Sequence, residues 1–149
     1  MIKYLFVFIF STSLLAQKTS PKTAHIFVAL CDNINQGIVP VPKTLGNGQN
    51  PKTNLYWGAL YGVKTHFKKS KDWTFVQSIP SHNPQILERI LFKHTATDTY
   101  LLADAYDGKY IKQTTIDFLK ASSGNFSTTI QVDGKALDFG GKADLVSYI

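Results

Sequence analysis

The chain has 149 residues, one cysteine and a formal charge of +6, and 44% of its residues are hydrophobic. This size and composition fit one domain with one core, which excludes a disordered protein, and a single cysteine excludes an internal disulfide. The only basic cluster is formed by Lys64, Lys68, Lys69 and Lys71. Such a cluster is typical of a solvated helix face, so no nucleic-acid partner is predicted.

The N-terminus has the pattern of a secretory signal peptide. Lys3 precedes an apolar run over residues 4–10, and after residues 11–15 the small residue Ala16 precedes Gln17. The apolar run is shorter than the about 20 residues that a membrane-spanning helix needs. We therefore predict a signal peptide at 1–16, a single α/β domain at 17–149, and a periplasmic or secreted protein with no stable membrane span after cleavage. An uncleaved anchor is the alternative.

The first expected strand covers residues 24–30. It is apolar except for His25 and does not alternate, which indicates a strand covered on both faces, as in a parallel sheet. Residues 32–54 follow Cys31 and are rich in proline and glycine, so they are expected to form a long loop. A loop of this length in a small domain is more often functional or mobile than a plain connection.

The rest of the chain alternates between helical and extended patterns. We expect helices at 55–69 and 109–121, and strands at 73–76, 89–93, 99–105, 126–132 and 143–149. The polar residues 94–98 between two apolar runs favour a hairpin. The predicted fold class is α/β, with a mainly parallel sheet flanked by helices and including a hairpin.

Candidate site residues follow two of the expected strands. Cys31, Asp32 and Asn33 come after the first strand, and Asp104 follows the run "TYLLA". Ligands of open α/β sheets bind outside the carboxyl ends of the parallel strands, so these four side chains are expected to line a site. Asp104 also interrupts an apolar run, and a carboxylate in that setting is either paired or at a site.

Each candidate also has a purely structural interpretation. Cys31 is either a nucleophile, which needs a nearby base, or a small buried hydrophobic residue; no histidine lies close in sequence. Asp32 and Asn33 line a site mouth or cap the following turn. Asp107 either joins Asp104 in holding a cation or forms a turn with Gly108, the structural interpretation being favoured.

No metal or cofactor is predicted. The sequence has no HExxH, CxxC or GxSxG motif and no histidine pair with metal-ligand spacing. The glycine-rich residues 45–51 lack the lysine of a phosphate-binding loop.

Two long strings carry a resemblance to known proteins. The strings "VALCDNINQGIVPVPKTLGNGQNPKTNLYWGALYGVKTHFKKSKDW" and "LLADAYDGKYIK" resemble a family of exported bacterial proteins of uncharacterised function, over nearly all of residues 17–149. In that family a Gly-His step follows the last strand present here, and an Ala-Cys step follows one strand later. This layout is similar to that of caspase- and gingipain-like cysteine peptidases.

The resemblance implies a caspase-like fold and a C-terminally truncated chain that lacks its catalytic histidine and cysteine. Cys31 does not match the position of the family's presumed nucleophile, so the catalytic residues stay unknown. Three functions are left open: an incomplete cysteine hydrolase, a non-catalytic domain that binds a peptide or a small molecule, or a structural or surface-interaction protein with no site. The sequence does not determine the oligomeric state.

Overall fold

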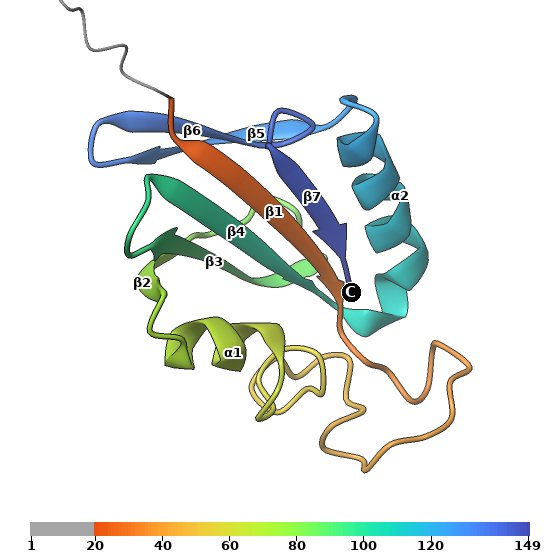
Figure 1. The fold of residues 1–149 in the computed structure, drawn as a ribbon. Coiled ribbons are helices and arrows are strands. Elements are labelled where there is room, and N and C mark those ends of the chain that lie inside the picture. Colours follow the sequence, from red (N-terminus) through yellow and green to blue (C-terminus); the bar gives the residue numbers. More distant parts are fainter. Residues whose placement is uncertain (1–19) are drawn as a thin grey trace, which may run out of the picture.

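The computed structural model describes residues 20–149 (Figure 1). The strands are β1 (Lys22–Ala29), β2 (Trp73–Ser78), β3 (Ile86–His94), β4 (Thr99–Tyr106), β5 (Ser127–Val132), β6 (Lys135–Gly140) and β7 (Leu145–Tyr148). The helices are α1 (Val63–Lys69), a 3₁₀ turn at Gly108–Tyr110, and α2 (Ile111–Ser122). The predicted signal peptide at 1–16 lies outside the described residues. Within them, no helix is long and apolar enough to span a membrane.

The main sheet is mixed. Its strand order is β2-β3-β4-β1-β7. The internal strand β1 pairs in parallel with both β4 and β7, whereas β3 is antiparallel to both β2 and β4. The α/β class is therefore confirmed, but the mainly parallel arrangement is not. The cause is the short link at residues 95–98, because only antiparallel strands can be joined by so few residues.

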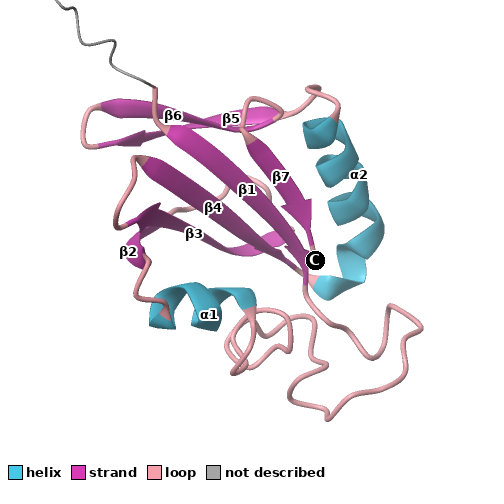
Figure 2. Cartoon of the chain, in the orientation of Figure 1, coloured by secondary structure: helices cyan, strands magenta, loops and turns pink. Residues whose placement is uncertain are grey.

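The two faces of the sheet are covered by different elements (Figure 2). On one face, Val28 and Ala103 belong to a cluster that includes Trp57, which precedes helix α1, and Val63 of α1. On the other face, Phe27 packs with Ala121 of α2. β1 therefore buries both of its faces, as its unbroken apolar run predicts.

A second hairpin, β5–β6, contributes to the α2 side. Its turn at Asp133 and Gly134 has φ values of 48° and 74°, which suits the tight turns that join antiparallel strands. Leu137 and Phe139 of β6 are buried against the main sheet. The sequence analysis did not predict β6, although the buried side chains of this strand alternate as in a strand with one wet face.

The predicted helix at 55–69 is α-helical only in its second half. Residues 55–62 form turns instead. A Cβ atom at Gly58 would overlap the backbone of Lys52, and one at Gly62 would overlap the backbone of Trp57. Both positions therefore require glycine, because the backbone approaches them too closely for a side chain. Glycine also has a low helix propensity, which disfavours a helix over these residues.

Candidate functional site

Three parallel strands end at one edge of the sheet. Leu30 N donates to Tyr106 O at 3.1 Å, and Ala29 N donates to Ile149 O at 3.0 Å. The carboxyl ends of β1, β4 and β7 therefore lie side by side. The loop at 32–54 extends from this edge, as Figure 1 shows.

Cys31 lies under this edge and is fully buried. Its N–H donates to Asn54 Oδ1 at 3.1 Å and its carbonyl accepts from Asn54 Nδ2 at 2.8 Å. Burial, together with the charge of Asp32, raises the pKa of the Cys31 thiol, while the hydroxyl of Tyr56 acts in the opposite direction. A buried thiol with a raised pKa is a poor nucleophile, so this environment suits packing.

Asp32 is 1% exposed and organises the loop. Its Oδ1 accepts from the N–H groups of Ile34 and Asn35 at 2.9 and 3.2 Å. Its Oδ2 accepts from Asn35 Nδ2 and Gln49 Nε2 at 2.8 and 2.9 Å. Burial raises the pKa of Asp32, but these four hydrogen bonds outweigh it and the pKa lies below its usual value.

Gln49 joins the loop to the end of β4. Its Nε2 donates to Asp32 Oδ2 and, at 2.7 Å, to Asp107 Oδ1. The N–H of Gly108 also donates to Gly48 O at 2.9 Å. The loop is therefore fixed at both strand ends, which favours a preformed surface over a mobile connection.

We expect Gly108→Ala to destabilise the edge of the sheet. A Cβ atom at this position would overlap the carbonyl oxygen of Leu30 and would lie 2.7 Å from Asp32 Cβ. Backbone atoms cannot move aside cheaply, so the change should cost about 1–3 kcal/mol of unfolding free energy. Urea unfolding measures this, with Gly124→Ala as the control. A Cβ atom at Gly124 would meet open space, but the φ of 78° is unfavourable for alanine. This variant therefore reports the cost of backbone strain without atomic overlap. A Gly108→Ala variant that is as stable as the unmodified protein would contradict the packing described.

Asn33 closes the first turn of the loop. Its Nδ2 donates to Val41 O at 2.8 Å, and its Oδ1 accepts from Val41 N at 3.1 Å. Its own N–H donates to Gly46 O at 3.0 Å. The amide therefore replaces a backbone pairing and holds residues 33–46 in a compact ring.

A pocket of about 170 Å³ opens in this ring. Its lining residues are Asp32, Asn33, Ile34, Lys43, Gly46, Asn47 and Gln49. Ile34 lines the pocket and is 87% exposed, and Val39 on the same loop is 88% exposed. We refer to these two exposed aliphatic side chains of the loop as the apolar rim; only Ile34 lines the pocket itself.

Asp104 does not lie at this edge. It is an internal residue of β4, faces the α2 side of the sheet and is fully buried. Arg89 holds it with two hydrogen bonds, Nε to Oδ1 and Nη2 to Oδ2, both 2.6 Å long. His25 Nε2 lies 3.0 Å from Oδ2. The structure therefore brings Cys31, Asp32 and Asn33 together and places Asp104 in a separate network.

The charge of Asp104 is well compensated. Burial raises its pKa, but the hydrogen bonds and positive charge of Arg89 and the contact with His25 hold the pKa below its usual value. The sequence analysis left two interpretations of Asp104, a paired carboxylate or a site residue. The contacts with Arg89 and His25 fit the paired carboxylate.

The sequence analysis missed four residues that shape these sites: His25, Gln49, Asn54 and Arg89. A signal was available for two of them, because His25 and Arg89 interrupt apolar strands in the same way as Asp104. Gln49 and Asn54 lie in a polar loop, where nothing distinguishes a bridging amide from a solvated one. Among residues 20–149, no group of three or more His, Cys, Asp or Glu side chains is placed to hold a metal ion.

Comparisons with protein-family models, curated proteins and solved structures find no match for this chain. The function is therefore inferred from the geometry of the chain itself.

Proposed function

We propose that the chain is an exported, non-catalytic binding domain whose loop at 32–54 holds a peptide. The observation that carries this proposal is the pocket at the carboxyl edge, with Asp32 anchoring its floor and Ile34 beside it. In open α/β sheets this edge is where ligands bind. A loop braced by hydrogen bonds loses little conformational entropy on binding.

The chemistry of the edge suits a peptide better than an ionic ligand. The four hydrogen bonds accepted by Asp32 occupy its carboxylate, so little of its charge is available to a ligand. Amide side chains of the ring can pair with peptide N–H and C=O groups. Ile34 and Val39 supply apolar contact, and Lys43 is an exposed cation at the rim.

Removing the apolar rim should weaken peptide binding without harming the fold. A peptide selected from a random heptapeptide library is expected to bind the double variant Ile34→Ser/Val39→Ser at least about tenfold more weakly, because each side chain would bury its exposed area on binding. Calorimetric titration measures the Kd. Leu119→Ser is the matched control, since Leu119 is also an exposed aliphatic residue but lies on α2. If the control weakens binding as much as the rim variant, or the rim variant has no effect, the proposed site is wrong.

A second candidate function has its own support. We propose as the alternative that the domain is the framework of a caspase-like cysteine hydrolase whose histidine and cysteine lie beyond Ile149. β7 is parallel to β1 and ends beside the residues before Cys31, so a residue following Ile149 would enter the edge near Asp32. Reading the gene beyond the codon for Ile149 tests this. Codons for a Gly-His and a later Ala-Cys step would support the framework, and their absence would remove it.

A further inference from the structure

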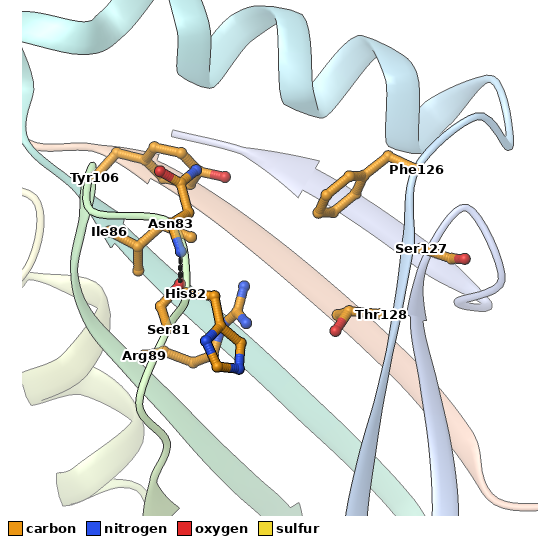
Figure 3. A pocket seen from close by; sticks show the side chains of 9 residues that line it. All are labelled: Ser81, His82, Asn83, Ile86, Arg89, Tyr106, Phe126, Ser127 and Thr128. Atoms are coloured by element: carbon orange, nitrogen blue, oxygen red, sulfur yellow. Dashed lines mark hydrogen bonds between the residues drawn. The ribbon is translucent and has the colours of Figure 1, made fainter.

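A second pocket lies over the buried Arg89 network, on the α2 side of the sheet (Figure 3). Its volume is about 200 Å³. The lining residues are Ser81, His82, Asn83, Ile86, Arg89, Tyr106, Phe126, Ser127 and Thr128. It is separate from the carboxyl-edge pocket and shares no residue with it.

Arg89 presents hydrogen-bond donors to this pocket. Its side chain is 9% exposed, and Asp104 accepts from Nε and Nη2. A guanidinium has five N–H donors, so three remain: two on Nη1 and one on Nη2. Within residues 20–149 none of these three has an acceptor. Figure 3 shows the guanidinium pointing into the space between the loop at 81–83 and the start of β5.

The remaining walls supply further donors and an apolar surface. The hydroxyl of Thr128 has no hydrogen-bond partner in the described part of the chain, and His82 is exposed on the opposite side. Ile86, Tyr106 and Phe126 give the apolar wall. Hydrogen-bond donors of Arg89 and Thr128 therefore lie at one end of the pocket, and the aliphatic and aromatic side chains lie at the other.

We propose that this pocket binds a small carboxylate with an apolar or aromatic body. A carboxylate matches the planar fork of a guanidinium, and its oxygens can accept from Arg89 and Thr128 together. Asp104 cancels the formal charge of Arg89, so directed N–H groups, rather than net charge, select the ligand. The fixed Asp104–Arg89 geometry prepares the fork before the ligand arrives.

Nearby carboxylates do not block such a ligand. Asp104 is engaged by Arg89 and His25. Asp117 does not line the pocket, and its oxygens accept from Tyr106 Oη at 3.2 Å and Gln113 Nε2 at 2.8 Å. Both carboxylates are thus already engaged by donors of the protein itself.

The test uses benzoate as the probe and benzyl alcohol as its neutral counterpart. NMR titration of the purified protein is expected to give saturable benzoate shifts around Arg89 and Phe126, with a Kd on the order of 1 mM for so small a ligand. Benzyl alcohol should bind at least about tenfold more weakly, because it cannot accept a bidentate pair. Equal binding of both probes would show an apolar hollow only and would overturn the proposal.

Two variants assign the binding to named donors. Arg89→Lys keeps a positive charge beside Asp104 but removes the fork, and should reduce benzoate affinity at least about tenfold. If that variant fails to fold, Thr128→Val removes one donor at constant shape and should weaken benzoate binding about three- to tenfold. Thr129→Val, one residue along the same strand and absent from the pocket, is the matched control. Benzoate binding that is the same in Thr128→Val as in the Thr129→Val control would contradict the proposal.

Discussion

Asp104→Asn is expected to lower the free energy of unfolding by about 3–5 kcal/mol, the largest loss of any single change considered. Arg89 would keep its charge in a buried site, while the amide would turn an N–H donor toward one of the guanidinium N–H groups that now donate to Asp104. His25 would also lose its charged partner. Urea unfolding followed by circular dichroism measures the loss.

An exposed ion pair provides the matched control for Asp104. Asp98 pairs with Lys135 at 3.0 Å, but both side chains are well exposed. Asp98→Asn should therefore cost no more than about 1 kcal/mol, as is usual for pairs in contact with water. If both variants lose the same amount, Asp104 is not the centre of a buried charge network.

Replacing both partners should cost less than replacing one. The double variant Arg89→Met/Asp104→Leu removes the two charges together, and exchanges of this kind are often close to neutral. A double variant that is as unstable as Asp104→Asn would show that the network contributes stability beyond charge compensation. Since Arg89 also lines the α2-side pocket, this variant should bind no benzoate even when it is stable.

Asp32→Asn is expected to cost about 2–4 kcal/mol and to release the loop at 32–54. Four donors converge on the carboxylate, and an amide can accept only at one of its two ends. Its NH₂ group would face the donating side chains of Asn35 and Gln49. Urea unfolding gives the cost, and amide hydrogen exchange of residues 33–54 reports the release.

The control for this change is Asp133→Asn. Asp133 is exposed in the β5–β6 turn, and its φ of 48° is one that asparagine adopts readily. It should alter stability by less than about 0.5 kcal/mol. Unchanged exchange in the loop of Asp32→Asn would contradict the bracing role of Asp32.

The same carboxylates determine the expected acid sensitivity. The pKa values of Asp32 and Asp104 lie below the ordinary value of 3.8 in the folded protein. The stabilisation from each is complete above the unfolded-state pKa and is lost as the pH falls through the lowered folded-state pKa. Stability should therefore decline below about pH 4, with a shallower decline in Asp32→Asn. Urea unfolding over a pH series checks this, and an equally steep decline in the variant would exclude Asp32 as a source.

Much of the fold could be predicted from the sequence because local patterns determine it. The apolar run at 24–30 identified the buried internal strand β1, and the short polar link at 94–98 indicated the β3–β4 hairpin. That hairpin also makes the sheet mixed, because its two strands are antiparallel. The prediction of a mainly parallel sheet did not take this into account. Gly58 and Gly62 delay the start of the predicted helix, because turns bring them into close contact with the backbone of Lys52 and Trp57. A helical periodicity in the sequence does not reveal such contacts.

The candidate sites were less predictable because they depend on tertiary pairing. Cys31, Asp32 and Asn33 were correctly placed after β1, since a strand end can be recognised locally. Asp104 was assigned to the same edge, yet its partners Arg89 and His25 lie 15 and 79 residues away in sequence. Nothing in the sequence around Asp104 indicates that Arg89, on the neighbouring strand β3, compensates its negative charge. The polar interruptions of β1, β3 and β4, considered together, were the available clue.

The most direct test of the account is an amide NMR map of the selected heptapeptide bound to the protein. We predict that the largest shifts fall within residues 33–49, around Ile34, Lys43 and Gln49, with little change on α2. Shifts confined to α2, the β5–β6 hairpin or the β2 edge, with the loop unaffected, would contradict the proposal that the carboxyl edge is the binding surface.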